Sequence, residues 1–303
     1  MTVINPSNLD LLTLRIFVLT AQNESLTSTA ERIHMTLSAV SRRLSDLEQV
    51  IGMPLFERRH RAMKLTPAGE AMLAHAQLIV SASQRLAGSM AEFSQGVTGT
   101  VRLWANTSAI VQFLPKDLYA YRTLFNDVKV QMQERLSDEI IRAVQAGDID
   151  VGIVAHNSAS VGVEKIGYRK DQLVLVVPHG HELLSQDHAS LEDILGRPFV
   201  GTNEGSAILR LVTDLAAAQG KTLQISLLAS SFEAILSLVE AGHGVSVLPR
   251  AAIAKSATAR NMTMLPIHER WASRQLYLAY RGEQSVNPQV HRLVSFLGSR
   301  GAV

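Results

Sequence analysis

Two groups of polar residues in this sequence have types and spacings that suit specific binding. The first begins at Thr36 and continues through Ser38, Ser41, Arg42 and Arg43. Hydroxyl and guanidinium groups hydrogen-bond the base edges and the phosphates of DNA. We therefore predict that Ser38, Ser41 and Arg42 face base edges or the groove wall and that Arg43 contacts phosphate. The alternative is a solvated helix face on which Arg42 pairs with the acidic residue four positions later.

Positive charge is concentrated around this first group. Between Glu31 and Lys64 there are seven basic and four acidic residues, although the whole chain carries a net charge of only +2. Arg58, Arg59 and Arg61 form a basic segment that we predict to contact phosphates. A charge run is more often only a solvated surface, so the charge by itself does not establish a polyanionic partner.

The second group consists of hydroxyl side chains that follow predicted strands at the starts of predicted helices. Helix starts offer free N–H groups and partial positive charge, which suit a carboxylate. In open α/β domains, ligands bind beyond the carboxyl ends of strands. Each hydroxyl could instead be an ordinary helix cap, and Glu204 argues against a highly charged anion. The predicted ligand-binding residues are Thr107, Ser108, Ser137, Thr202, Ser206, Ser230 and Ser231.

Short helices must position the first group. Residues 9–65 show helical periodicity with brief breaks. Thr36 is a good N-cap for a helix in which Val40, Leu44 and Leu47 are spaced by four and three residues and face inward. Two short helices with a tight turn, the second exposing hydroxyls and arginines, are what a helix-turn-helix needs to enter the major groove.

A long helix is predicted to start at Thr66-Pro67, a hydroxyl N-cap followed by proline. The residues after it recur with spacings of four and three, which is a heptad seam with one polar position. The helix could pack on its own domain, but little chain flanks it, so we favour a dimerising connector. The seam residues are Met72, Ala76, Ile79, Ser83, Leu86, Met90 and Phe93.

After Gly99, short apolar strands alternate with amphipathic helices. One such strand is expected at residues 172–177, and helices are expected at 138–146, 207–217 and 232–241. The alternation predicts an α/β architecture with mostly parallel sheets, and two clusters of these units predict two lobes around a cleft.

Missing residue types and motifs exclude several classes of protein. Without cysteine the chain forms no disulfide, thiolate zinc site or cysteine nucleophile. It has no Gly-x-Ser-x-Gly elbow, no dinucleotide-binding glycine motif and no P-loop. His179 and His181 lack an evident third metal ligand. We therefore expect a protein that is not an enzyme and needs no metal or cofactor.

Composition favours a soluble chain. Apolar residues make up 47% of it and charged residues 18%, enough for a sizeable core. The longest apolar run noted in the middle of the chain, Leu173–Val177, is too short to cross a bilayer, and the first residues lack the features of a secretory signal. The expected location is the cytoplasm, without a membrane partner.

A series of short motifs runs through the N-terminal third of the chain and continues less densely to its end. The first part contains Leu11-x-x-Leu-x-x-Phe17, Ser25-Leu26, Ala39-Val40-Ser41-Arg42, Leu47-Glu48, Gly52-x-x-Leu-Phe-x-Arg58 and Leu65-Thr66-x-Ala-Gly69. The second contains Phe113-Leu-Pro115, Gly147-Asp-Ile-Asp-Val151, His181-Glu-Leu183 and Gly242-x-Gly-Val-x-x-Leu-Pro249. Together these motifs resemble the LysR-type transcriptional regulators of bacteria over nearly the whole chain.

The chain departs from this family at the start of the predicted recognition helix. Where members often carry Ser-Gln-Pro, this sequence has Thr36-Leu37-Ser38. Leu37 cannot hydrogen-bond a base, but it could contact the methyl group of thymine.

The resemblance implies a domain order and a function. We expect a winged helix-turn-helix at residues 1–65, a dimerising helix at 66–95 and a two-lobed effector domain, like a periplasmic binding protein, at 96–303. Lobe I should comprise about 96–156 and 268–303, and lobe II about 157–267. The family implies a homodimer or homotetramer that binds an inverted-repeat promoter site, a small effector between the lobes and RNA polymerase as a further partner. Whether it activates or represses stays open.

Overall fold

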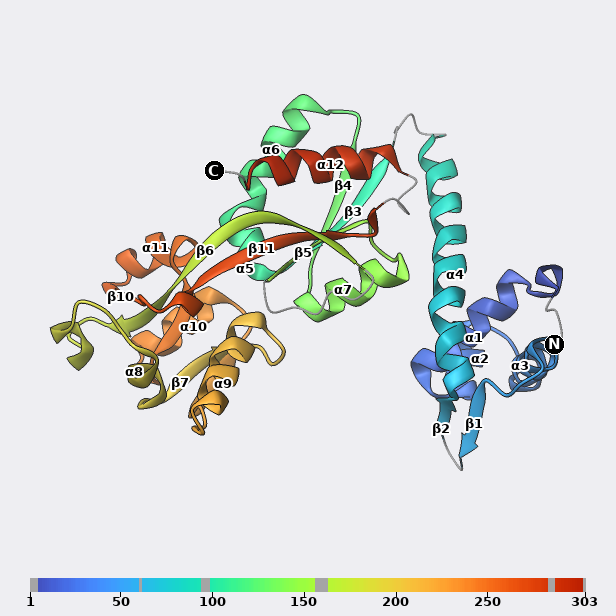
Figure 1. The fold of residues 1–303 in the computed structure, drawn as a ribbon, viewed down its shortest axis with the longest axis horizontal. Coiled ribbons are helices and arrows are strands. Elements are labelled where there is room, and N and C mark those ends of the chain that lie inside the picture. Colours follow the sequence, from blue (N-terminus) through green and yellow to red (C-terminus); the bar gives the residue numbers. More distant parts are fainter. Residues whose placement is uncertain (1–4, 60–61, 94–98, 156–162, 283–286, 302–303) are drawn as a thin grey trace. The chain divides into compact units, whose positions relative to one another are not determined.

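The computed structural model describes residues 5–59, 62–93, 99–155, 163–282 and 287–301 (Figure 1). The chain divides into two compact units, one formed mainly by residues 1–96 and the other mainly by residues 97–303. The hydrophobic cores of the two units are separate, and each unit is described by itself. Across the described residues, no helix combines the length and the apolarity needed to cross a membrane.

The first unit consists of short helices and a two-stranded hairpin. The side chains of Asp10, Ser25 and Thr36 cap its first three helices, which confirms the cap predicted at Thr36. Gly52 ends the third helix with a φ of +79°, which glycine adopts without strain. The elements are the 3-10 turn η1 (Pro6–Asn8), α1 (Leu11–Asn23), α2 (Leu26–Arg32), α3 (Leu37–Ile51), β1 (Phe56–Arg59), β2 (Ala62–Leu65) and α4 (Pro67–Phe93).

The core of the first unit joins α3 to α1 and to the hairpin. Val40, Leu44 and Leu47 are buried on one side of α3, so the inward spacing predicted for this helix is confirmed. The rings of Phe17 and Phe56 lie in the same core with their centroids 5.3 Å apart. Burial of this stripe leaves the opposite face of α3 for solvent or a partner.

The first turns of α4 pack on the same core. Ala76 and Val80 are buried there, and Met72 is partly buried. Gly69 comes so close to the segment before β1 that a Cβ atom would lie 2.2 Å from the carbonyl oxygen of Leu55. The helix and the hairpin therefore meet at this point only because residue 69 has no side chain.

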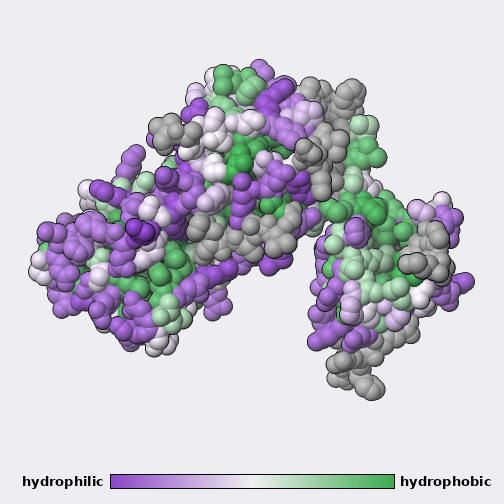
Figure 2. All heavy atoms as spheres, viewed as in Figure 1, coloured by the Kyte–Doolittle hydropathy of each residue, from purple (hydrophilic) through white to green (hydrophobic). Residues whose placement is uncertain are grey.

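The predicted heptad seam of α4 divides between two environments. Its first residues face the core, whereas Ile79, Leu86 and Met90 are 47%, 64% and 58% exposed. The buried core extends along the helix only as far as Val80, so the later apolar residues have no neighbour in it. Figure 2 shows hydrophobic surface over these later turns. The side chain of Phe93 lies outside the described residues.

The second unit is built on a seven-stranded mixed sheet in the order β10-β6-β11-β5-β3-β4, with β9 also paired to β6. Only β3, β4 and β5 run parallel in it, while β6, β9, β10 and β11 pair antiparallel. A small sheet pairs β7 and β8 in parallel. The strands are β3 (Thr100–Ala105), β4 (Lys129–Glu134), β5 (Val151–Ala155), β6 (Glu164–Pro178), β7 (Phe199–Thr202), β8 (Ile225–Ala229), β9 (Ser246–Pro249), β10 (Met262–Pro266) and β11 (Ser273–Tyr280).

The expectation of mostly parallel sheets is therefore wrong. The difference arises from β6, which is expected from the sequence only at residues 172–177 but begins at Glu164 in the structure. The first half of this strand is mostly polar and only partly buried, so apolar periodicity marked only its buried second half. The long strand pairs antiparallel with β11 along residues 164–172 and with β10 along residues 174–178.

The second unit contains two separate large cores, which β6 connects. The first core includes Leu103, Tyr168 and Leu276 and is covered by α5, α6 and α12; a small cluster beneath α7 adjoins the same strands. The second core includes Leu175 and Val247 and is covered by the remaining helices. The helices are α5 (Thr107–Gln112), α6 (Leu114–Leu124), α7 (Ser137–Ala146), α8 (Leu191–Leu195), α9 (Ala207–Ala218), α10 (Phe232–Glu240), α11 (Arg250–Ala259) and α12 (Pro288–Ser299), with 3-10 turns η2 (Glu182–Ser185) and η3 (Arg270–Ala272).

Candidate functional site

The exposed face of α3 carries most of the first predicted group. Thr36 accepts the N–H of Ala39 at 3.3 Å, and its hydroxyl lies 3.2 Å from that of Ser38. Thr36, Ser38 and Arg42 are exposed and Ser41 is half-buried. Within the described residues Arg42 forms no ion pair with the acidic residue at position 46, so that alternative is not seen in this structure. The exposed side chains of Ser38 and Arg42 and the half-buried hydroxyl of Ser41 are therefore accessible to a partner, while Thr36 acts as the cap of α3.

Arg43 has a different environment from Arg42. Its Nη1 donates to Thr13 Oγ1 at 2.9 Å and to Asp10 Oδ2 at 3.3 Å, at the start of α1. Burial raises the pKa of Asp10, but hydrogen bonds from Thr13 and the charge of Arg43 outweigh this effect and leave it below its ordinary value. Arg43 therefore fixes the position of α3 against α1.

The hairpin is attached to the end of α3 by one carboxylate. Glu48 Oε1 accepts the N–H groups of Leu55 and Phe56 at 2.8 and 3.2 Å, just before and at the start of β1. Arg58 and Arg59 follow on β1, opposite Met63 and Ala62. The third predicted basic residue of this segment, Arg61, lies outside the described residues.

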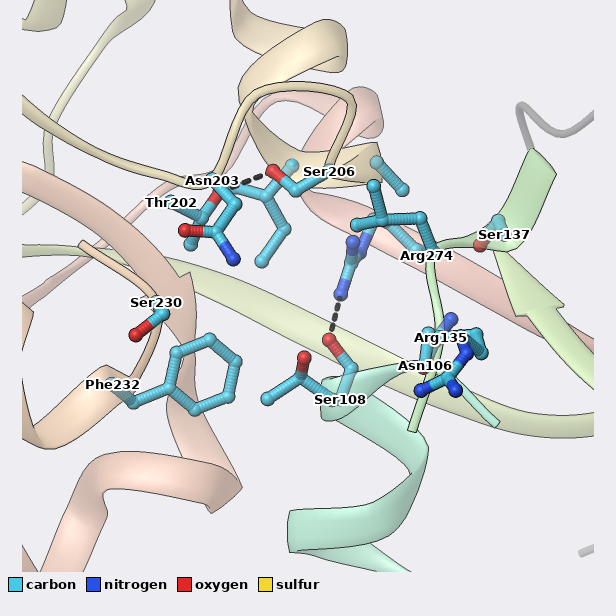
Figure 3. A pocket seen from close by; sticks show the side chains of 14 residues that line it. Asn106, Ser108, Arg135, Ser137, Thr202, Asn203, Ser206, Ser230, Phe232 and Arg274 are labelled. Carbon is cyan, nitrogen blue, oxygen red and sulfur yellow. Dashed lines mark hydrogen bonds between the residues drawn. The ribbon is translucent and has the colours of Figure 1, made fainter. Parts of the chain in front are cut away.

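The second unit contains a pocket at the carboxyl ends of several strands (Figure 3). The loops after β3, β4, β7 and β8 contribute to its wall. Six of the seven predicted hydroxyl residues line it together, namely Thr107, Ser108, Ser137, Thr202, Ser206 and Ser230. Ser231 does not line the pocket, and its Oγ accepts the N–H of Ala234 at 3.2 Å as the cap of α10.

Several of these hydroxyls are already engaged. Ser206 caps α9, accepting the N–H of Leu209 at 3.2 Å, and is hydrogen-bonded to Thr202. Ser137 accepts the N–H of Ala155 at 3.3 Å. Thr107 donates to the carboxylate of Glu134, so its proton is not available to an anion. The cap interpretation is thus right for Ser206 and Ser231, and Thr107 is a poorer carboxylate donor than the sequence predicts.

The pocket also contains residues that the sequence did not indicate. Asn106 caps α5, and the guanidinium of Arg135 lies 5.1 Å from the ring centre of Trp104. The other unpredicted polar residues of the wall are Asn203 and Arg274, and Phe232 adds an aromatic ring. Asn106 and Asn203 follow predicted strands, as the hydroxyls do, so the same rule could have found them.

The described side chains that line the pocket include two arginines. These are Arg135 and Arg274, and no Asp, Glu or His is among the described lining residues. Glu204, which counted against a charged anion in the sequence, is exposed and does not line the pocket. The helices α7, α9 and α10 begin beside it, which adds partial positive charge. The arrangement therefore suits a small ligand with a negative charge and an apolar part.

A helix-turn-helix unit followed by an α/β unit with such a pocket defines a ligand-responsive, DNA-binding transcriptional regulator. The family model "Bacterial regulatory helix-turn-helix protein, lysR family" matches residues 11–70, and the model "LysR substrate binding domain" matches residues 94–302. The chain belongs to the LysR family.

Relatives and solved structures are similar over nearly the whole chain. The RuBisCO operon transcriptional regulator of Allochromatium vinosum is 26% identical, covering 95% of both chains. The transcriptional dual regulator GltC of Bacillus subtilis is 29% identical, covering 86% of both. The crystal structure of CbnR, a LysR family transcriptional regulator, has a TM-score of 0.65 at 21% identity and covers 97% of this chain and 100% of its own. CbnR complexed with its target DNA has a TM-score of 0.63 at 21% identity and covers 96% and 99%.

Proposed function

We propose that α3 reads an inverted-repeat promoter site through Ser38, Ser41 and Arg42, with Thr36 at the groove wall. The observation that carries this proposal is the free polar face of α3 opposite the buried Val40–Leu47 stripe. The likeness to a relative solved with its target DNA supports it. The proposed phosphate contacts come from Arg43 beside α1 and from the hairpin residues Arg58, Arg59 and Arg61.

We infer that the protein is a homodimer through α4 and a homotetramer through its second unit. The exposed residues Ile79, Leu86 and Met90 lie seven and four positions apart, on one face of the helix. Two edge strands of the second unit, β4 and β8, expose further apolar side chains, among them Met132 and Ile225. Apolar surface of this kind typically marks a protein interface.

We propose that two lobes hold a small carboxylate effector in the pocket. Lobe I comprises about 96–156 and 268–303 together with the first half of β6, which packs in the first core, and lobe II comprises the rest of about 157–267. The two separate cores and the two arginines of the lining support this. An effector that favours one arrangement of the lobes changes the spacing of the DNA-binding units and so the DNA bend, with RNA polymerase as the partner that responds. The proposed role is cytoplasmic regulation without catalysis or a cofactor.

The test is to select duplexes from a random-sequence DNA library with the full chain. We expect an enriched inverted repeat that binds at least about 1,000-fold more tightly than a scrambled duplex at the same salt concentration. The variant S41A/R42A should lose the enrichment, and the control K255A, which removes an exposed lysine of α11, should keep it. Equal affinity for selected and scrambled duplexes would contradict the proposal.

A further inference from the structure

A buried ion pair forms part of the pocket wall. Arg274 on β11 and Asp171 on β6 stand opposite each other in the antiparallel register, and Arg274 Nε donates to Asp171 Oδ1 at 2.9 Å. A second hydrogen bond joins Nη2 of the same guanidinium to Oδ2. Arg274 is only 6% exposed and Asp171 only 4%. Because an unpaired buried charge is costly, Asp171 is what keeps a guanidinium at this place in the wall.

The hydrogen bonds around this pair leave two donors unused. Gln112 Nε2 donates to Asp171 Oδ2 at 3.3 Å, so both carboxylate oxygens have partners. Arg274 Nη2 also donates to Ser108 Oγ at 3.2 Å (Figure 3). Since Ser108 accepts this bond, its own hydroxyl proton stays available. Within the described part of the chain, neither that proton nor the Nη1 group of Arg274 has an acceptor.

These donors belong to a pocket that also offers an apolar surface. Arg274 and Ser108 both line the cavity, and the ring of Phe232 is part of the same wall. A hydroxyl and a guanidinium N–H that are already held in place suit the two oxygens of one carboxylate, and hydrogen bonds of this charged kind are strong. Asp171 cancels most of the charge of Arg274, so this part of the wall suits a single negative charge better than a phosphate or a dicarboxylate.

We infer that Arg274 and Ser108 bind the carboxylate of an organic monocarboxylate effector, with Asp171 as the residue that positions Arg274. This inference rests on the proposed effector pocket and names the ligand class and its anchor. It also assigns Asp171 a second effect: its negative charge weakens anion binding, so the affinity for the effector is set by the pair and not by Arg274 alone.

The test uses the full chain with benzoate, phenylacetate and hexanoate, each compared with its primary amide. Binding is measured by calorimetry and by the shift in melting temperature. We expect at least one acid to bind the parent with a Kd at least tenfold lower than that of its amide. D171N should bind that acid more tightly than the parent, because the competing negative charge is gone while the amide oxygen still accepts from Arg274.

The double variant D171N/R274Q removes both charges and leaves no unpaired buried charge, so it is expected to fold. It should lose the tenfold preference for acid over amide. The matched control R260Q removes an arginine of the same unit that pairs with Glu233 and Glu240 and does not line the pocket, and it should bind like the parent.

Two outcomes would overturn the inference. One is a double variant that keeps the full preference for the acid, which would place the carboxylate elsewhere in the pocket and leave the proposed effector site intact. The other is a parent that binds no acid more tightly than its amide. Failure of the proposed function is a separate result. It would appear in the DNA selection, which is carried out without the Asp171 and Arg274 variants.

Discussion

Arg43 Nη1 lies 3.3 Å from Asp10 Oδ2, and this contact joins α3 to the cap of α1. Successive residues on a helix point about 100° apart, so holding Arg43 against α1 leaves its neighbour Arg42 directed elsewhere. The two adjacent arginines thus differ: Arg43 orients the helix in addition to its proposed phosphate contact, whereas Arg42 has no such contact with α1 and is directed to a partner.

The substitution R42A should weaken binding to the selected inverted repeat more than binding to random duplex. A bidentate contact to a base edge contributes about 1–3 kcal/mol of discrimination, which predicts a loss of roughly tenfold or more on the specific site only. Fluorescence anisotropy on both duplexes at one salt concentration measures this. The same loss on both would reassign Arg42 to a phosphate contact.

Leu37 is 48% exposed at the first position of α3, where we expect it to touch a thymine methyl group. Replacing each thymine of the selected site by deoxyuridine in turn removes only that methyl group. We expect one position at which the replacement lowers affinity for the parent and has no effect on L37A. If every position affects the parent and L37A alike, Leu37 does not read the methyl group.

The substitution R59A should lower affinity for every sequence and flatten its dependence on salt. Each phosphate contact contributes a slope near −0.9 to a plot of log affinity against log salt concentration, so the slope should fall by about that amount. Titrations at four salt concentrations give the slope, with K255A as the control. An unchanged slope would contradict the role of the hairpin as a phosphate-binding wing.

The double substitution I79E/L86E should convert the assembly to smaller species while both units stay folded. Both residues are exposed in the described chain, so a charge at either position should not destabilise the fold of the unit. Met72 is unsuitable because it packs on the core of the first unit. Light scattering gives the mass. The control A74E/Q84E changes exposed residues five positions from Ile79, roughly 140° around the helix. An unchanged mass in I79E/L86E would refute a dimer through α4.

The second unit should become less stable as the pH falls, because His181 then gains a proton and can no longer act as a cap. Burial, followed by the charge of Arg197, lowers the pKa of His181 below 6.5, and its neutral Nδ1 accepts the N–H of Leu183 at 3.2 Å as the cap of η2. The stabilisation is therefore present above pH 6.5 and is lost as the pH falls through 6.5 towards the lower folded value. The variant H181N keeps an accepting cap at every pH.

Urea unfolding at pH 8 and pH 5 measures this difference. We expect the parent to lose up to about 1 kcal/mol more unfolding free energy than H181N between these two pH values, which is the usual value of a helix cap. The control H243N alters an exposed histidine and should behave as the parent does. Equal losses in the parent and H181N would show that the cap does not titrate.

Local signals predicted the elements that carry short-range chemistry. The caps at Thr36 and Thr66-Pro67 and the inward stripe of α3 depend on residues within a few positions, and the structure confirms them. Hydroxyls after strands gave six residues of the pocket because strand ends converge whatever the connections between them.

Long-range relationships were not predictable from the same signals. Arg274 and Asp171 are 103 positions apart, and each lies one position before a strand predicted from the sequence. Only the register of β6 and β11 places them together. Strand direction also depends on connectivity, which is why the antiparallel half of the sheet was missed. The heptad spacing of α4 identified its apolar residues but not how far along the helix the core of the first unit extends.

The register of β6 and β11 shows how the second core is connected to the rest of the second unit. Gln172 and Ser273 are the last opposed residues of this pair, so the segment between them, which includes the second half of β6, β9 and β10, begins and ends at neighbouring points. Topologically, the second core is a module inserted into a β-hairpin. A two-residue Asn-Gly turn could replace it and close the hairpin directly. Recombination could therefore exchange this half of the ligand-binding unit between related regulators as one cassette, together with its own strands β9 and β10, while β3, β4, β5 and β11 keep their pairing.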